Sequence, residues 1–374
     1  MRSEAGETRS SIGIIGAGPA GAAAALRLGQ LGVSGVVLVD RDEFPRDKTC
    51  GSGVSPKGIE TLKRLGVWDL VQRRAYWIRG IRLVTPRNRE VCVSAGDSTA
   101  AVICNRRTLD EILVQEARAL GVRFLPRFQV TALLRDGERV VGFEARDGRK
   151  VRAACTVVAD GTHSVLSPAS GSRRLMQAIM GWWDDVPFQP HTVEMVLDRM
   201  VTPGYGWLFP ESETRVSIGI CYEDVAHARN ARQLFERFLA KHYADRLAGA
   251  TPVGRWKGHP IAYGFRIGRL SSPGRLAVGE AGGLAHPATA EGIYQGMRSG
   301  ILAGEALAAL VHGQADEPLA FAAYESQCRR AFQRSFQGAR LWRTALASPL
   351  PDWIVALVQR PALQSTIGRL LAGM

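Results

Sequence analysis

The feature that most constrains the fold of this 374-residue chain is a glycine-rich turn near its start. The turn reads Gly-Ala-Gly-Pro-Ala-Gly and contains Gly16, Gly18 and Gly21. It follows the apolar stretch Ser11–Ile15 and precedes an alanine-rich segment with the composition of a helix, residues 22–31. In such a strand-turn-helix unit the first glycine permits the tight turn, the second lets a pyrophosphate approach the backbone, and the third lets helix and strand pack closely. The pattern therefore predicts a dinucleotide site.

A second apolar stretch, Val36–Val39, ends in Asp40, 19 residues after Gly21. A carboxylate at this point of the fold binds a ribose hydroxyl, and an acidic rather than a basic residue favours an unphosphorylated adenosine ribose. The first glycine cluster thus predicts NAD or FAD and leaves the choice between them open.

A second glycine cluster lies about 260 residues after the first. It begins at Val278-Gly279-Glu280, where an apolar stretch again breaks into glycines, and Pro287 and a helical run, Gly292–Leu310, follow it. A nicotinamide-binding fold does not need this second cluster, so the two clusters together favour FAD.

The chain is strongly basic, with 48 Lys and Arg residues against 35 Asp and Glu residues and a formal net charge of +13. The charge favours an anionic partner such as a phosphorylated cofactor, a diphosphate substrate, an acidic electron donor or a membrane surface. An arginine-rich composition from a high-GC genome is an equal alternative. The arginines form no basic tract or recognition motif, so nucleic acid is not expected as a partner.

Two further observations limit the kind of protein. The six cysteines form no CxxC pair and have no histidine partner at metal-ligand spacing, so no metal site is expected. No run of 18 apolar residues occurs and residues 1–10 are polar, so neither a spanning helix nor a secretory signal is expected. The expected location is cytoplasmic.

The polar loop after Asp40 carries a resemblance to a known family. It ends in Pro45-Arg46-Asp47-Lys48-Thr49-Cys50-Gly51-Ser52-Gly53. This resembles the Pro-Arg-x-Lys-x-Cys-Gly-Gly-Gly-like segment of the geranylgeranyl reductase family of flavoproteins, which are relatives of the aromatic hydroxylases and flavin-dependent halogenases; Ser52 departs from it. Because that segment lies against the flavin, the resemblance implies FAD contacts for Arg46, Lys48, Cys50 and Gly51.

Two strand ends in the middle of the chain extend the resemblance. The segment from Arg106 to Asp110 is similar to the family's Arg-x-x-Phe-Asp, with Leu109 in place of Phe, and implies that Arg106 reaches the cofactor. Simple solvation of a helix start is the alternative for Arg106. The apolar run Val151–Ala159 ends in Asp160-Gly161, which resembles the Asp-Gly motif that closes the cofactor site in these flavoproteins.

The second glycine cluster also matches the family. Gly279-Glu280 resembles the Gly-Asp motif whose carboxylate holds the ribityl chain of FAD, with Glu280 in place of Asp. Pro287–Ile293 resembles the family's Pro-x-x-x-Glu-Gly-Ile, and the resemblance implies that the helix start at Gly292 and Ile293 lies at the flavin.

The segment Gly204–Pro210 resembles the Tyr-x-Trp-x-Phe-Pro motif of the substrate-facing sheet in geranylgeranyl reductases, whereas halogenases carry Trp-x-Trp-x-Ile-Pro. Tyr205 and Trp207 alternate along a strand and so lie on one face of it. Alternation by itself is equally consistent with core packing. The resemblance implies substrate contacts for Tyr205, Trp207 and Phe209. It implies the same for Tyr294, which directly follows the Pro287–Ile293 motif.

The resemblance extends from Ser11 to about Leu310 and implies an α/β fold. A discontinuous Rossmann-type FAD-binding domain would comprise residues 1–75, 100–165 and 270–312. An inserted α+β substrate domain, built on an antiparallel sheet, would comprise residues 76–99 and 166–269, and a C-terminal helical tail residues 313–374. In that tail we expect helices at 319–341 and 352–371, separated by the breaker Ser348–Pro351. The final stretch, which is apolar at 353–358 and 367–374, is expected to cap the substrate cavity, with peripheral membrane contact as the alternative.

The family implies an FAD-dependent oxidoreductase that reduces carbon-carbon double bonds of an isoprenoid or other apolar substrate by hydride transfer from reduced flavin. A side-chain acid must add the proton, and Cys50 is our first choice, ahead of Tyr205, Tyr294 and His286. An FAD-dependent monooxygenase (hydroxylase) or, less favoured, a halogenase of secondary metabolism is the alternative. A further alternative is a flavin electron-transfer protein that acts on a protein partner.

The source of electrons is open at this stage. The chain has no second GxGxxG on its own βαβ unit. NAD(P)H must therefore dock transiently, or ferredoxin or a flavin reductase must serve as the external electron donor.

Overall fold

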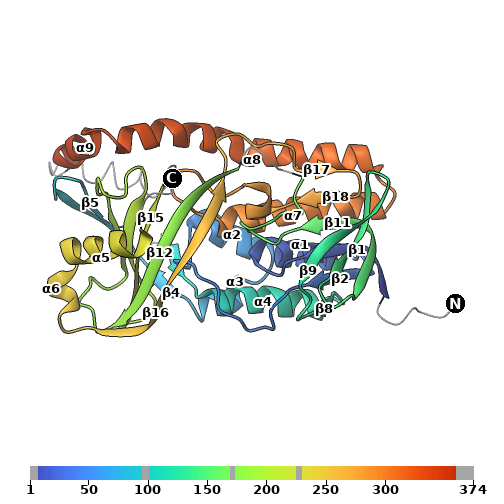
Figure 1. Cartoon of the computed structure of the whole chain (residues 1–374), viewed down its shortest axis with the longest axis horizontal. Coiled ribbons are helices and arrows are strands. Elements are labelled where there is room, and N and C mark those ends of the chain that lie inside the picture. Colours follow the sequence, from blue (N-terminus) through green and yellow to red (C-terminus); the bar gives the residue numbers. More distant parts are fainter. Residues whose placement is uncertain (1–6, 95–100, 169–172, 225–229, 359–374) are drawn as a thin grey trace.

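A computed structural model describes residues 7–94, 101–168, 173–224 and 230–358, and the predicted segment 359–374 lies outside the described residues. The molecule is elongated (Figure 1). A layered α/β unit lies at the end that carries the N-terminus, a second sheet lies at the opposite end, and one long helix, α8, runs along both (Figure 1).

The first unit is built on five parallel strands. Their order is β18 (Arg275–Ala277), β11 (Lys150–Val158), β1 (Glu7–Ile15), β2 (Val36–Val39) and β8 (Arg123–Leu125). The short β17 (Ser271–Ser272) adds an antiparallel strand beyond β18. Parallel strands are covered on both faces, which explains why the inner strands read as continuous apolar runs. The predicted Rossmann-type fold is confirmed.

Different layers cover the two faces of this sheet. Ile12 and Ile14 of β1 pack toward the helices α1 (Pro19–Gln30), α4 (Arg106–Ala119) and α7 (Ile293–Val311). The next residue along β1, Ile15, points to the opposite face, because side chains alternate along a strand. There the antiparallel β9 (Val130–Asp136) and β10 (Arg139–Ala145), which extend from β11, bury Phe143.

Helices α1 and α7 pack almost backbone to backbone. A β-carbon at Gly300 of α7 would lie 2.2 Å from the carbonyl oxygen of Ala20 in α1, and one at Gly304 would lie 3.2 Å from that of Ala24. Gly296 also lies against Ala20, so the helices run in the same direction with their N-termini side by side. Small residues on both helices permit this approach.

The second unit is a seven-stranded sheet. Its order is β16 (Thr251–Tyr263), β12 (Arg174–Asp184), β15 (Arg215–Tyr222), β14 (Tyr205–Pro210), β13 (Thr192–Val196), β5 (Gly80–Val84) and β6 (Glu90–Ser94). The antiparallel sheet was predicted, but β13 and β5 pair in parallel. The two strands lie more than 100 residues apart in the sequence, so no hairpin dictates their direction.

The two faces of the second sheet pack differently. One face packs on α5 (Ala231–His242), where Phe238 fills the space over Gly206, and the short α6 (Ala244–Leu247) follows α5. The other face carries Tyr205 and Trp207 of β14 and Tyr263 of β16. Leu346 of α8 packs against the same cluster. The predicted alternation of Tyr205 and Trp207 thus places both on the face that the long helix covers.

Small elements join the two units. Strands β3 (Gly53–Val54), β7 (Ala101–Ile103) and β4 (Tyr76–Ile78) form a three-stranded sheet, so β4 pairs with β7 and not with the larger sheet that begins at β5. In the sequence, α2 (Pro56–Arg64) and α3 (Trp68–Gln72) lie between β3 and β4. The second glycine cluster forms a 3-10 turn, η1 (Gly279–Gly282), after β18.

The C-terminal helices fasten the two units together. Helix α8 (Glu317–Leu346) is longer than predicted, and α9 (Leu350–Val358) follows at the predicted breaker. Tyr324 donates a hydrogen bond to the carbonyl oxygen of Ala277 in the first unit (2.6 Å), and Arg343 donates to the Tyr263 hydroxyl of the second (2.8 Å). In α9, Asp352 Oδ1 accepts from Thr85 Oγ1 at 2.5 Å.

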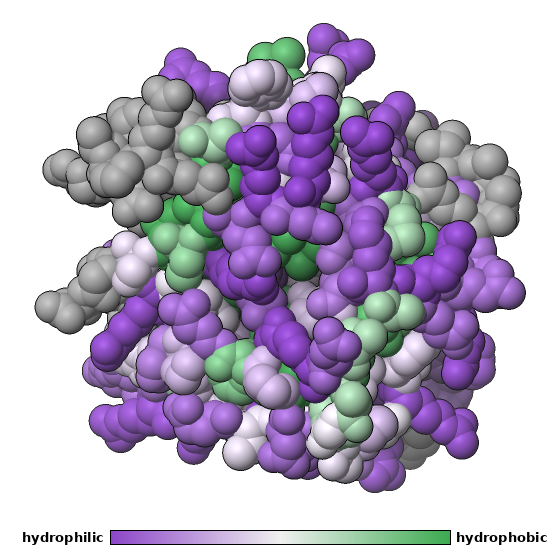
Figure 2. All heavy atoms as spheres, turned by 90° about the vertical axis from the view of Figure 1, so that its left-hand side faces the viewer, coloured by the Kyte–Doolittle hydropathy of each residue, from purple (hydrophilic) through white to green (hydrophobic). Residues whose placement is uncertain are grey.

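Within the described ranges, no helix is both long enough and apolar enough to cross a membrane. Figure 2 looks at the end that holds α9 and β5, and polar side chains cover most of it, with smaller apolar patches between them.

The contact between α1 and α7 predicts a specific sensitivity. We expect Gly300→Ala to lower the free energy of unfolding by about 1–3 kcal/mol, because the added methyl overlaps the Ala20 carbonyl and must push the helices apart. Gly338→Ala is the matched control, since Gly338 is also helical but has open space around it, and it should raise stability by about 0.5–1 kcal/mol. Urea unfolding followed by circular dichroism measures both; equal effects would contradict the proposed contact.

Candidate flavin site

The three glycines of the first cluster differ in what surrounds them. Gly16 has φ +97°, and a β-carbon there would lie 2.5 Å from the carbonyl oxygen of Ala159. A β-carbon at Gly21 would lie 1.9 Å from the Gly16 carbonyl oxygen, whereas one at Gly18 would approach nothing closer than 3.5 Å. Gly16 and Gly21 are thus required by the fold, but Gly18 is not, and its free space faces two arginines.

The Asp40 carboxylate shapes this turn. Asp40 is buried; its Oδ2 accepts from the Ala17 N–H at 2.7 Å and its Oδ1 from the Asp42 N–H at 3.0 Å. Each carboxylate oxygen has a second lone pair, so a ribose hydroxyl can still be accepted. The ribose contact of Asp40 remains a prediction, and its hydrogen bond to the glycine turn is an additional structural role.

Arg106 is held rigidly beside the turn. Its Nε and Nη2 donate to the two oxygens of the fully buried Asp110, at 2.8 and 2.6 Å. Burial opposes the charge of Arg106, but Asp110 outweighs it and raises the pKa of the guanidinium. Arg106 is therefore a buried, permanent cation, and solvation of a helix start does not explain it.

The residues around Gly18 fit a diphosphate. The position of a Gly18 β-carbon lies 3.5 Å from Arg106 Nη2 and 3.8 Å from Arg46 Nη2. Arg46 Nη1 lies 3.2 Å from Asp110 Oδ2 and Nε lies 3.7 Å from Asp42 Oδ2, yet neither of these buried nitrogens donates an aligned hydrogen bond to any described residue. Gly18 therefore faces two guanidinium groups, whose Nη2 atoms could donate to an anion in the free space beside it. The N-termini of α1 and α7, which lie together, add their positive dipole ends.

The second glycine cluster meets the Asp160-Gly161 motif. Glu280 Oε2 accepts a hydrogen bond from Thr162 Oγ1, the residue after Gly161. On its other side, Glu280 Oε1 lies 3.1 Å from the position of a Gly292 β-carbon. Burial raises the pKa of Asp160. The longer side chain of Glu280 thus bridges the Asp160 strand end and the start of α7; its ribityl contact remains a prediction.

Lys48 and Cys50 lie in an electropositive cluster. Burial, followed by the Arg106 charge, lowers the pKa of Lys48 to about 8. The Cys50 thiol accepts from the Ser52 N–H at 3.3 Å. Burial is the largest influence on the pKa of Lys48, Arg106 and Tyr205, and Cys50 contributes to all three.

The structure adds two histidines that the sequence did not identify. Burial, followed by the charge of Lys48, lowers the pKa of His259 to about 4, and the His259 ring lies 5.4 Å from that of His163. His259 lies on β16 of the second sheet. A lone histidine on a strand gives no signal in the sequence; only the docking of the two units brings it to Lys48.

The Tyr205–Pro210 strand lies directly against the Cys50 loop. A β-carbon at Gly51 would lie 3.3 Å from the Phe209 ring and 3.5 Å from Trp207 Nε1. Trp207 Nε1 is buried and has no acceptor within the described part of the chain. The Tyr205 hydroxyl donates to the Thr289 carbonyl oxygen at 2.5 Å, and burial raises its pKa well above the usual value. Three predicted motifs therefore converge, although they come from distant parts of the sequence.

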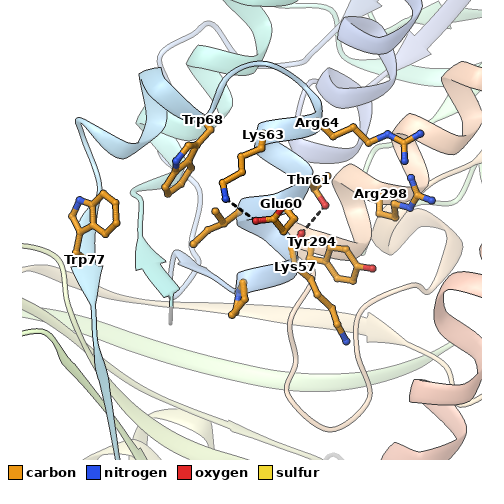
Figure 3. A pocket seen from close by; sticks show the side chains of 11 residues that line it. Lys57, Glu60, Thr61, Lys63, Arg64, Trp68, Trp77, Tyr294 and Arg298 are labelled. Atoms are coloured by element: carbon orange, nitrogen blue, oxygen red, sulfur yellow. Dashed lines mark hydrogen bonds and ion pairs between the residues drawn. The ribbon is translucent and has the colours of Figure 1, made fainter. Parts of the chain in front are cut away.

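Two other predicted residues have different surroundings. His286 Nδ1 accepts from the Thr289 N–H at 3.2 Å while Nε2 pairs with Ser335 Oγ at 2.9 Å. Burial lowers its pKa to about 4, which favours the neutral ring, and both ring nitrogens take part in contacts that hold the turn together. Tyr294 packs on Phe332 and lines a separate groove beside α2 (Figure 3).

Among the residues that the structure describes, no three His, Cys, Asp or Glu side chains are grouped so that they could hold a metal ion.

The glycine turn predicts two separable effects. We expect Gly18→Ala to fold with wild-type stability but to bind FAD at least about 10-fold more weakly, because the methyl fills the space beside the arginines. Gly21→Ala should destabilise the protein by about 2 kcal/mol or more, because its methyl overlaps backbone. Thermal unfolding and FAD titration followed by flavin fluorescence measure the two effects. Weak FAD binding without a loss of stability in Gly21→Ala would contradict these roles.

The pKa of Lys48 predicts how FAD binding depends on pH. The negative charge of FAD stabilises the protonated form of Lys48. At a pH where Lys48 is neutral in the free protein, FAD binding must therefore be accompanied by the uptake of a proton by Lys48. FAD affinity should therefore fall as the pH rises from about 7 to about 9.5, by less than about 10-fold per unit. In Lys48→Met the affinity should be weaker at neutral pH and lose this dependence, whereas the control Lys150→Met should keep it. An unchanged pH profile in Lys48→Met would exclude Lys48 from the cofactor site.

Comparisons with known proteins agree with this site. The family model described as FAD binding domain matches residues 9–339. A menaquinone reductase of Mycolicibacterium smegmatis is 28% identical over 371 residues, which cover 93% of this chain and 86% of that protein. A digeranylgeranylglycerophospholipid reductase of Methanothermobacter thermautotrophicus is 26% identical over 346 residues, covering 86% and 83%.

Two solved structures share the fold. A geranylgeranyl bacteriochlorophyll reductase-like protein from Thermoplasma acidophilum has a TM-score of 0.82 at 20% identity, covering 95% of this chain and 91% of its own. A flavin-dependent brominase has a TM-score of 0.79 at 23% identity, covering 98% and 94%. The match of the family model over most of the chain, at the residues that form the glycine turn and its arginines, shows that this protein belongs to the FAD binding domain family and is an FAD-dependent oxidoreductase.

Proposed function

We propose that this flavoprotein reduces carbon-carbon double bonds of an isoprenoid or another long apolar molecule. The observation that carries the proposal is the convergence of three segments: Cys50–Gly53, Tyr205–Pro210 and Pro287–Ile293. These are the segments on which the resemblance to geranylgeranyl reductases rests. Relatives named menaquinone reductase and digeranylgeranylglycerophospholipid reductase, each with coverage above 80% in both directions, support the same reading.

The side chains suit an apolar substrate. Bound flavin in its reduced form supplies the hydride. Trp207, Phe209 and the Tyr205 ring present aromatic surface next to Gly51, which excludes water and favours an alkene over a charged group. Lys48 and Arg106, which belong to the cofactor motifs, lie close enough to Cys50 to interact with it electrostatically.

The second hydrogen must arrive as a proton, and Cys50 is the best-placed donor. The phenol of Tyr205 is committed to the Thr289 carbonyl, and its raised pKa makes it a weak acid. The Cys50 sulfur accepts a hydrogen bond from the Ser52 N–H and interacts with the Arg106 guanidinium, so its own proton is not needed for these contacts. After the proton leaves, the neighbouring cations Lys48 and Arg106 would stabilise the thiolate.

The cellular setting is also proposed. We infer a cytoplasmic protein that uses NAD(P)H, ferredoxin or a flavin reductase as its donor, and its net charge of +13 supports an anionic partner. Exposed apolar side chains on α8 and α9, namely Leu341, Trp342, Leu350 and Trp353, support peripheral contact with a bilayer that holds long apolar substrates. The packing of Val355 on Val91 supports the alternative role of α9 as a cover for the second sheet.

The proposal predicts turnover without oxygen. Enzyme reduced by dithionite under argon should saturate double bonds of geranylgeranyl diphosphate or menaquinone, which mass spectrometry detects as a gain of two hydrogens per bond. Cys50→Ser should keep its flavin spectrum but turn over about 100-fold more slowly or worse, as expected when a general acid is lost. Cys92→Ser is the control, because Cys92 is an exposed cysteine on β6.

Two outcomes would count against this function. If reduced enzyme leaves both alkenes unchanged and a hydroxylated product forms only with oxygen and NAD(P)H, the protein is a monooxygenase. Full activity of Cys50→Ser would leave the reduction in place but remove Cys50 as the proton donor.

A further inference from the structure

A groove of about 630 Å³ lies beside α2, apart from the convergence of motifs described above (Figure 3). Residues of α2, α3, β4 and α7 line it. Its lining combines three aromatic side chains, Trp68, Trp77 and Tyr294, with four cations. No role that we have assigned so far accounts for this combination.

The cations outnumber their partners. They are Lys57, Lys63, Arg64 and Arg298, and Glu60 is the single carboxylate in the lining. Lys63 pairs with Glu60 at 2.7 Å, and Arg64 pairs at 2.7 Å with Glu305, outside the lining. Lys57 and Arg298 form no ion pair with any described residue. The groove therefore keeps two cations outside any ion pair among the described residues, although Glu291 lies close enough to Lys57 to interact with its charge, and these cations favour an anionic ligand.

The two tryptophans lie at the opposite end of the groove from Arg298, whereas Tyr294 lies near Arg298 (Figure 3). The rings of Trp68 and Trp77 meet edge to face, 5.9 Å apart with an angle of 71° between their planes. Both are half-buried, so their positions are fixed while part of each ring stays accessible. Fixed, partly open tryptophan rings bind planar heteroaromatic rings by stacking.

The groove backs onto the start of α7. Tyr294 directly follows the Pro287–Ile293 motif, and a β-carbon at Gly58 of α2 would lie 3.9 Å from the Tyr294 β-carbon. The Lys57 charge adds to burial in lowering the pKa of His286 within the motif. A ligand in the groove thus lies one layer of side chains from the segments that form the flavin site.

We propose that this groove binds the adenosine diphosphate half of NADPH or NADH, the electron donor that the flavin needs. The adenine would stack on Trp68 and Trp77, and the phosphates would lie against Lys57 and Arg298. The nicotinamide ring would give a hydride, which carries two electrons, to the oxidised flavin and leave as the oxidised nicotinamide cation. The inference deepens the proposed function, because it names the donor of that same reaction.

A prenyl diphosphate fits the groove less well. A long prenyl chain needs an enclosed apolar channel, whereas this groove is open to solvent and the charged groups of Lys57, Glu60, Lys63 and Arg64 lie along it. A dinucleotide needs a flat aromatic contact at one end and cations at the other, which is the arrangement observed. The surplus of cations also favours NADPH, with its additional phosphate, over NADH.

The test uses ADP-ribose and its 2′-phosphate as probes, because neither can reduce the flavin. Both should bind the FAD-loaded wild-type protein, with quenching of tryptophan fluorescence and with heat measurable by titration calorimetry at low salt. Lys57→Ala/Arg298→Ala should weaken both by about 10- to 100-fold, since two charge-assisted phosphate contacts are lost. Trp77→Leu should weaken binding by about 10-fold through loss of stacking.

The matched control removes the same charge elsewhere. Arg123→Ala/Arg266→Ala replaces two exposed arginines that do not line the groove, and it should bind ADP-ribose within about twofold of wild type. The flavin absorption spectrum and the thermal midpoint of each variant establish that it is folded and loaded. Stopped-flow reduction by NADPH should show the same rise in Kd for the groove variant.

Three results would overturn the inference. They are failure of ADP-ribose to bind the wild-type protein, unchanged affinity in Lys57→Ala/Arg298→Ala, and a groove variant that loses affinity for geranylgeranyl diphosphate but not for ADP-ribose. Dithionite supplies electrons without any nucleotide, so wild-type turnover with dithionite tests the proposed reduction separately. A positive dithionite assay with no ADP-ribose binding would reject the groove and retain the function.

Discussion

The close contact between α1 and α7 fixes the position of the flavin site. Glycines on α7 let its backbone approach Ala20 and Ala24 of α1, and the two helices run in the same direction. Their N-termini therefore lie side by side, and each follows one of the two glycine clusters. Helix N-termini carry unpaired N–H groups and a partial positive charge, so their pairing creates a site for an extended anion. Arg46 and Arg106 then add full charges beside Gly18.

A second constraint joins this site to the larger sheet. Helix α8 spans 30 residues, about 45 Å, and bonds to the first unit through Tyr324 and to the second through Arg343. With the two units held in this way, the Tyr205 strand reaches the Thr289 carbonyl and Trp207 lies over the Cys50 loop. The aromatic surface that a substrate would meet therefore belongs to one unit, and the residues expected to hold the flavin belong to the other.

Sequence reasoning was most reliable where a residue type has one physical use. The parallel sheet, the glycine turn and the breaker between α8 and α9 followed from local patterns, because glycine, proline and apolar runs restrict the backbone directly. It was least reliable where a side chain has several uses. Tyr294 shares a motif with Ile293, but the structure places its ring in the α2 groove. His286 has the right type for a proton donor, but its nitrogens hold a turn.

The sequence by itself determined the cofactor-binding fold and the order of its motifs. Tertiary structure decided which of those motifs meet, because contact between residues about 50, 205 and 290 depends on how two sheets dock and not on any local preference. It also decided the charge states that matter, since burial and neighbouring cations lower the pKa of Lys48 and of His259. The α2 groove is of the same kind: its tryptophans and cations come from four separate elements, and only packing brings them together.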